Sequence, residues 1–128
     1  MEKFAAKSIL LVDDHRSFLT ILAEELRDRG NDFRILTAEN GDRALKVLES
    51  GQVDLVVTDL RMPVMDGFVL ISHMKEKHPS IPVIVVSSFL YPESETKLKA
   101  IGVSHCIEKY SLSISALEEM ILKSWQGG

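Results

Sequence analysis

Acidic side chains follow two short apolar runs of this sequence. Residues 9–12 lead into Asp13 and Asp14, and residues 55–58 lead into Asp59. An apolar run without polar alternation is typical of a strand that is covered on both faces of a parallel sheet. Ligands of such sheets bind beyond the carboxyl ends of the strands. Carboxylates gathered there would repel, each pair by about 3 kcal/mol at about 5 Å and an effective dielectric of about 20. The pattern therefore predicts a cation site.

The elements that must position these acids alternate along the chain. Expected strands cover 8–13, 33–38, 53–58, 81–86 and 103–108, and expected helices cover about 17–29, 41–50, 68–74, 94–101 and 115–125. Ser115 to Glu118 has the pattern of a capping box at the start of the last helix. Five strands and five helices with right-handed crossovers form a doubly wound parallel α/β sheet. We expect its first and third strands to be neighbours, which would bring Asp13, Asp14 and Asp59 together.

Length and charge narrow the possible functions. The chain has 128 residues, about one domain's worth, and a net charge of −4, so it lacks the basic footprint of a nucleic-acid binder. No apolar run is long enough to cross a membrane, and the single cysteine, Cys106, fits a reducing compartment. We expect one cytoplasmic domain over 1–128, with its core in about 8–125, no membrane segment and no direct nucleic-acid contact.

Four motifs resemble the receiver domains of two-component response regulators. In chain order they are residues 11–14 (Leu-Val-Asp-Asp), residues 59–67 (Asp-Leu-Arg-Met-Pro-Val-Met-Asp-Gly), residues 83–88 (Val-Ile-Val-Val-Ser-Ser) and residues 107–109 (Ile-Glu-Lys). The resemblance covers nearly the whole chain, and it implies a flavodoxin-like fold with strand order 2-1-3-4-5 and five helices. It also implies a phosphorylation-controlled switch in a phosphorelay rather than an enzyme.

The resemblance implies a role for each residue of the site. Asp59 would be the phospho-acceptor, taking its phosphoryl group from a sensor histidine kinase or a phosphotransfer protein. Mg²⁺ would be held by Asp13, Asp14, Asp59 and the backbone carbonyl of Arg61, and Lys109 would contact a phosphoryl oxygen. The phosphorylated domain would present a changed surface to an output domain or target, and a phosphorylation-dependent dimer is a further expectation.

Two serines compete for the hydroxyl that would move to the phosphoryl group. In the family this residue lies 22 positions before the lysine, and 109 − 87 = 22 in this chain. Ser87 also directly follows the apolar run of the fourth strand, whereas Ser88 lies one residue farther on. We therefore assign the role to Ser87.

Three positions depart from the usual receiver pattern. Tyr110 follows the lysine where proline is usual, and Cys106 occupies the place of an aromatic residue. A cis bond before a residue other than proline costs about 2.5–4 kcal/mol, so the loop after Lys109 is expected to be trans or strained. Apolar residues 89–91 follow the two serines. They form either an exposed contact patch or a segment that folds back onto the end of the fourth expected helix (94–101).

Other functions fit the residues less well. A phosphatase of the haloacid-dehalogenase type would have a second acid where Arg61 stands, and a flavodoxin would have a Ser/Thr/Gly-rich phosphate loop after the first strand. A degenerate receiver that binds partners without phosphorylation remains open. His15, beside the acid pair, has no second histidine at ligand spacing, and we interpret it as a solvated loop residue.

Overall fold

A five-stranded parallel sheet forms the centre of the molecule in the computed structural model, which describes residues 7–103 and 105–126. The strands are β1 (Ser8–Val12), β2 (Arg34–Ala38), β3 (Leu55–Thr58), β4 (Val83–Ser87) and β5 (His105–Glu108). They pair in the order β2-β1-β3-β4-β5. The expected doubly wound sheet is therefore confirmed.

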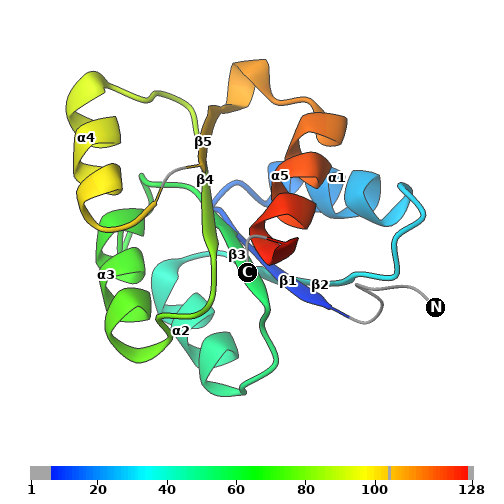
Figure 1. Cartoon of the computed structure of the whole chain (residues 1–128), viewed down its shortest axis with the longest axis horizontal. Helices are drawn as coiled ribbons and strands as arrows, with labels where there is room; N and C mark the ends of the chain where they lie inside the picture. Colours follow the sequence, from blue (N-terminus) through cyan, green and yellow to red (C-terminus); the bar gives the residue numbers. More distant parts are fainter. Residues whose placement is uncertain (1–6, 104, 127–128) are drawn as a thin grey trace.

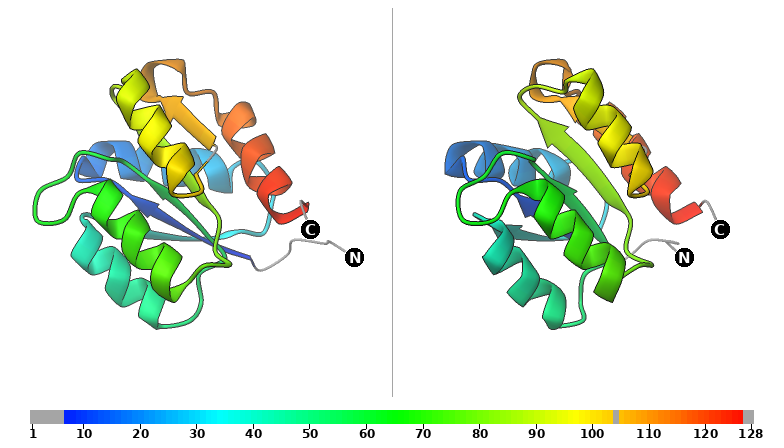
Figure 2. Two further views of the ribbon diagram at one scale, coloured as in Figure 1. Left: turned by 60° about the vertical axis from the view of Figure 1, so that its left-hand side comes forward. Right: turned by 90° about the vertical axis from the view of Figure 1, so that its left-hand side faces the viewer.

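Helices cover both faces of this sheet (Figures 1 and 2). They are α1 (Arg16–Arg27), α2 (Gly41–Glu49), α3 (Gly67–Lys77), α4 (Pro92–Ala100) and α5 (Ile114–Gln126), and a 3₁₀ turn, η1 (Lys109–Ser111), follows β5. Helices α1 and α5 lie on one face, and α2, α3 and α4 lie on the other. None of the helices in the described ranges combines the length and the apolar character needed to span a bilayer.

The strands contribute to two separate core layers because successive side chains point to opposite faces. Leu10 and Val56 pack with the buried residues of α2, α3 and α4. Leu11 and Val57 pack with those of α1 and α5. Every residue of β1, β3 and β4 is buried, which explains why these strands have continuous apolar runs instead of alternating ones.

The register of the central strands fixes where the acids lie. Val12 is paired with Thr58, so β1 and β3 end at the same level of the sheet. One residue later, the Asp13 N–H donates to the Ala38 carbonyl at 3.1 Å, and the Asp59 N–H donates to the Val12 carbonyl at 3.0 Å. Backbone pairing thus places both aspartates at the first step beyond the sheet.

The start of the last helix differs from the sequence prediction. The helix begins at Ile114, and the hydroxyl of Ser113 accepts a hydrogen bond from the Ala116 N–H at 3.3 Å. Glu118 does not reach back to the helix start, because it binds Arg29 and Asn31 instead. The predicted capping box from Ser115 to Glu118 is therefore wrong, since its glutamate makes a tertiary contact.

Gly67, the first residue of α3, packs directly against the backbone of the acid site. A β-carbon at this position would lie 2.2 Å from the carbonyl oxygen of Asp59 and 2.8 Å from the α-carbon of Leu60. The Gly67 N–H also donates to the Leu60 carbonyl at 2.7 Å. Only glycine allows α3 to begin this close to the end of β3.

We predict that Gly67→Ala destabilises the fold by about 1–3 kcal/mol, the usual cost of overpacking, because the obstructing atoms belong to the backbone. Urea unfolding followed by circular dichroism measures the change. Val69→Ala, at an exposed position of the same helix, is the matched control and should shift stability by less than about 0.5 kcal/mol. Equal stability of the two variants would show that the contact is not tight.

Candidate functional site

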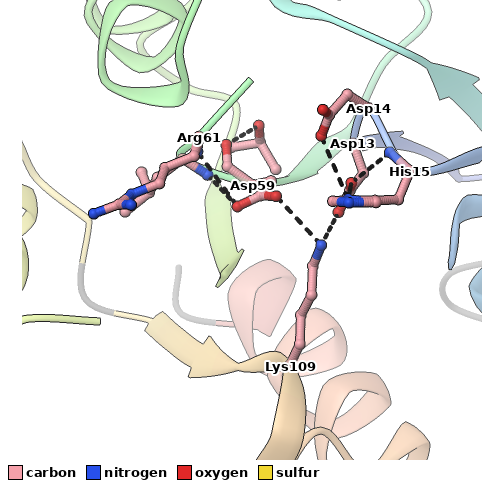
Figure 3. A network of polar contacts seen from close by, with 8 residues as sticks. Asp13, Asp14, His15, Asp59, Arg61 and Lys109 are labelled. Atoms are coloured by element: carbon pink, nitrogen blue, oxygen red, sulfur yellow. Dashed lines mark hydrogen bonds and ion pairs between the residues drawn. The ribbon is translucent and has the colours of Figure 1, made fainter. Parts of the chain in front are cut away.

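Three carboxylates gather at the carboxyl edge of the sheet (Figure 3). Asp13 and Asp59 are 2% and 4% exposed, respectively, whereas Asp14 is more open to solvent. An oxygen of each acid and a ring nitrogen of His15 all lie within 4.8 Å of one another. The structure thus brings together the three acids that the sequence indicated, and it adds a histidine.

A single lysine side chain bridges the two buried acids. Lys109, the first residue of η1, places its Nζ 2.7 Å from Asp13 Oδ2 and 3.3 Å from Asp59 Oδ2. The same Nζ lies 4.5 Å from the centre of the Phe18 ring, a distance suited to a cation–π contact. The ring and the two carboxylates together hold the ammonium between the strand ends, and Figure 3 shows its contacts with Asp13 and Asp59.

The surroundings of Lys109 favour its charged form. Burial of the ammonium acts to lower its pKa, but the hydrogen bond to Asp13 and the negative charges of Asp13 and Asp59 outweigh burial, so the pKa of Lys109 lies above its ordinary value. Lys109 is therefore a protonated cation at neutral pH.

Backbone groups fix the orientation of Asp59. Its Oδ1 accepts hydrogen bonds from the Leu60 N–H at 2.7 Å and from the Arg61 N–H at 3.4 Å. The Thr58 hydroxyl donates to the Asp59 carbonyl at 2.8 Å. These contacts leave Oδ2 directed at Lys109, so one oxygen of the carboxylate is held by the chain and the other faces the cluster.

The remaining residues expected at the site lie near it without joining the cluster. Ser87 is the last residue of β4 and is buried, while Ser88 is partly exposed in the bend that follows. Within the described ranges, no hydrogen bond links the Ser87 hydroxyl to Asp59. The Arg61 backbone lies beside Asp59, but its guanidinium points away and lies 5.6 Å from the centre of the Tyr91 ring (Figure 3).

Two departures from the receiver pattern have simple structural outcomes. No described peptide bond is cis, so the bond between Lys109 and Tyr110 is trans, and the Tyr110 side chain is largely exposed. Cys106 packs against the core layer of α2, α3 and α4. Burial raises the pKa of the Cys106 thiol, and Glu95 raises it further, so this partly buried cysteine keeps its proton at neutral pH.

Within the apolar segment after Ser88, one residue folds back and the other two are exposed, so each predicted arrangement applies to part of the segment. Leu90 folds back onto the core, whereas Phe89 and Tyr91 are about half exposed and stack with ring centres 6.3 Å apart. The Phe89 ring also contacts Tyr110 edge to face at 6.3 Å. Phe89 and Tyr91 further line a groove of about 550 Å³ beside the loop that follows β3.

The donor atoms of the cluster suit a small divalent cation. Two buried carboxylates share one ammonium, and a third, partly exposed carboxylate lies beside them, so negative charge is in excess. Mg²⁺ prefers oxygen ligands and commonly binds through one or two carboxylates while it keeps several waters. The partly exposed Asp14 leaves room for such waters beside the buried acids. The residues present therefore fit a Mg²⁺ site.

A family model supports this reading of the site: the model described as the response regulator receiver domain matches residues 9–122. The chain belongs to this family. It is 40% identical over 80 residues to the transcriptional regulatory protein GlrR of Escherichia coli K12, which covers 62% of the chain and 18% of the relative. It is 34% identical over 101 residues to the sensor histidine kinase RcsC of the same organism, which covers 79% of the chain and 10% of the relative. The chain thus spans less than a fifth of either protein.

Solved receiver structures have the same fold. The signal receiver domain of an HD domain-containing protein from Pseudomonas fluorescens superposes with a TM-score of 0.87 at 24% identity, over 95% of this chain and 96% of that one. The response regulator TrrA from Thermotoga maritima, solved in complex with Mg²⁺-BeF, gives a TM-score of 0.80 at 32% identity, over 92% and 98% of the two chains. The flavodoxin-like receiver fold is therefore confirmed.

One residue of the site was not found from the sequence, and a second was interpreted there only as a solvated loop residue. Phe18 has the spacing of a core residue of α1, and nothing in the sequence shows that its ring lies beside Lys109. His15 is 63% exposed, as expected for a loop residue, yet its Nδ1 lies 3.1 Å from Asp13 Oδ1 and 3.5 Å from Asp14 Oδ1. Its position next to the acid pair was the available signal.

We predict that Lys109→Gln lowers stability by about 1–3 kcal/mol in magnesium-free buffer, because Asp13 and Asp59 then lack their shared charged donor. Folding raises the pKa of Lys109. Its contribution to folding stability is therefore fully present below the unfolded-state pKa of about 10.4, and it is lost as the pH rises through the folded-state pKa. Thermal unfolding should show that the stability of Lys109→Gln stays below that of wild type by a constant amount between about pH 7 and 9.

Lys123→Gln is the control, because Lys123 pairs with Glu119 on an exposed helix face and such pairs contribute only about 0.2–0.5 kcal/mol. Added Mg²⁺ should narrow the difference between Lys109→Gln and wild type by binding the folded acids. A Lys109→Gln protein as stable as wild type would contradict the role given to this ammonium.

Proposed function

We propose that this chain is a phospho-accepting receiver, in which Asp59 takes a phosphoryl group from a phosphohistidine on a sensor histidine kinase or phosphotransfer protein. The observation that carries the proposal is the placement of the Lys109 ammonium between Asp13 Oδ2, at 2.7 Å, and Asp59 Oδ2, at 3.3 Å. Phosphoryl transfer depends mainly on positioning and charge stabilisation, and this arrangement offers both. The family match supports the same reaction.

Asp59 supplies the nucleophile. Because Oδ1 already accepts the Leu60 N–H, Oδ2 is the oxygen available to attack phosphorus. A new O–P bond forms while the P–N bond of the phosphohistidine breaks, and the electron pair of that bond returns to the ring nitrogen. The donor ring, protonated at its other nitrogen, leaves as neutral imidazole. Asp59 becomes an acyl phosphate, a known product of carboxylate nucleophiles.

The surrounding residues would offset the negative charge that is present during this transfer. Asp13, Asp14, Asp59 and the Arg61 carbonyl would hold Mg²⁺, which when bound offsets the negative charge of the acids and of the transferring phosphoryl group. Lys109 needs only a short movement to follow the phosphoryl oxygens. Its raised pKa keeps it protonated throughout.

The output of the reaction is a changed surface. Phosphorylation adds about −1.5 to −2 charges at Asp59, and the Ser87 hydroxyl and the Lys109 ammonium are proposed to close on them. Ser87 ends β4 and Lys109 directly follows β5, so the loops after these two strands would shift between two states. The face formed by α4, β5 and α5, with the exposed rings of Phe89, Tyr91 and Tyr110 at its edge, is the proposed reporting surface.

This function sets the proposed context of the domain. We infer a single receiver over 1–128 that acts as a switch rather than an enzyme, in the cytoplasm, without direct contact to nucleic acid or membrane. Its partners would be a kinase or phosphotransfer protein upstream and an output domain or target protein downstream. A dimer that forms on phosphorylation is part of the proposal. A phosphorylation-independent module has less support, because the acids and the lysine all converge.

We predict that acetyl phosphate with Mg²⁺ adds one phosphoryl group to the wild-type chain and none to Asp59→Asn, because the amide cannot act as the nucleophile. Intact-mass spectrometry with and without hydroxylamine, which cleaves acyl phosphates, gives the readout. Asp66→Asn is the matched control, since Asp66 is an acid of the same loop that caps α3 through the Val69 N–H. Modification of Asp59→Asn at the wild-type level would refute Asp59 as the acceptor.

We predict that Ser87→Ala still accepts the phosphoryl group but no longer switches, because only the hydroxyl that responds to it is lost. Amide NMR shifts in the loops after β4 and β5, measured with and without beryllofluoride and Mg²⁺, should change at least about twofold less than in wild type. Ser88→Ala should respond as wild type does. The opposite result for the two serines would transfer the role to Ser88.

A further inference from the structure

The His15 imidazole is a nitrogen donor at a site whose other donors are carboxylates. Its Nδ1 lies 3.1 Å from Asp13 Oδ1 and 3.5 Å from Asp14 Oδ1. One possible ligand atom from each of Asp13, Asp14, His15 and Asp59 lies within 4.8 Å of the other three. The proposed phosphotransfer makes no use of this nitrogen.

These spacings match the ligand shell of an octahedral ion. Metal–ligand bonds of about 2.1 Å put adjacent ligands about 3 Å apart and opposite ligands about 4.2 Å apart. The distances from His15 Nδ1 to the two carboxylate oxygens are close to the first value, and the 4.8 Å limit of the set is only slightly above the second. Small side-chain adjustments would therefore bring all four atoms onto one ion.

Lys109 and His15 approach different oxygens of Asp13. The ammonium contacts Oδ2, and the imidazole contacts Oδ1. In Figure 3 the lysine approaches from the end of β5, whereas Asp14 lies on the other side of the Asp13 carboxylate. An ion between Asp13 Oδ1, Asp14 and His15 can thus bind without displacing Lys109 from Asp13.

The His15 backbone also holds the residue in place, in addition to the hydrogen bond between its ring and Asp13 Oδ1. The His15 N–H donates to Asp13 Oδ1 at 2.9 Å, which fixes the loop beside the acid. His15 occupies the N-cap position of α1, but its side chain makes no capping hydrogen bond. Since the ring is 63% exposed, an arriving hydrated ion can reach Nδ1.

We propose that His15 Nδ1 is a ligand of the divalent-ion site and shifts its preference toward first-row transition ions. Imidazole suits Zn²⁺, Cu²⁺, Fe²⁺ and Ni²⁺, whereas Mg²⁺ favours oxygen donors. The ring coordinates as neutral imidazole with its proton on Nε2. This inference rests on the proposed metal site at Asp13, Asp14 and Asp59, and it adds the identity of the ion.

Calorimetric titration of the untagged chain with Ni²⁺ and, separately, with Mg²⁺ tests the inference. His15→Ala should weaken Ni²⁺ binding roughly tenfold or more, since outer-shell partners of a metal site alone account for about 10–100-fold. Mg²⁺ binding should weaken by less than about threefold. His73→Ala, which removes an exposed histidine of α3, is the control for adventitious surface binding and should leave the Ni²⁺ affinity of the acid cluster unchanged.

A second readout reports the ligand itself. Cu²⁺ bound to the wild-type chain should give an imidazole-nitrogen modulation in pulsed electron paramagnetic resonance, and His15→Ala should remove it. Unchanged Ni²⁺ affinity and retained modulation in His15→Ala would overturn the inference while leaving the Mg²⁺ site intact. Absence of Mg²⁺ binding to the wild-type chain would instead overturn the proposed metal site on which it rests.

Discussion

The excess of negative charge at one edge of the sheet is the constraint on which the rest of this structure depends. Asp13 and Asp59 are almost completely buried, and one ammonium, Lys109, lies between them. Buried carboxylates are costly unless they are paired or hydrogen-bonded. Lys109 and the backbone N–H groups that hold Asp59 offset only part of that cost, and the proposed divalent ion would offset the rest. A site built in this way responds strongly to any further change of charge.

The pairing of the strands places these charged groups close together. Parallel pairing of β1 with β3 makes both strands end at one level, so the two acids meet without any long side chain having to reach across. The lysine comes from β5, two strands from β3 in the sheet order, and only a long side chain could cover that separation. The ring of Phe18 packs against the ammonium, and the close start of α3 at Gly67 packs against the backbone of Asp59 and Leu60.

Much of this arrangement could be predicted from the sequence. The apolar runs ending in acids identified β1 and β3, because strands buried on both faces cannot alternate, and the motif spacing indicated Asp59, Lys109 and Ser87. The sequence could not predict features that depend on tertiary contacts. Glu118 matched a capping box but binds Arg29 and Asn31 instead. The proximity of Phe18 to Lys109 brings together residues far apart in the chain, which no local pattern records. The roles of the site residues come from the family resemblance, and they stand as proposals.

The aromatic contacts outside the site connect three loops that surround the acceptor. Phe89 touches Tyr91 within the β4–α4 loop and Tyr110 after β5, and the Arg61 guanidinium lies over Tyr91 from the loop after β3. These rings form a cluster of solvent-facing aromatic contacts at the carboxyl edge of the sheet. Because each loop shares a ring contact with a neighbour, a displacement begun in one of them is resisted or passed on by the other two. Contacts between solvent-facing side chains therefore link the three segments, in addition to the buried contacts that Leu60 and Leu90 make with the core.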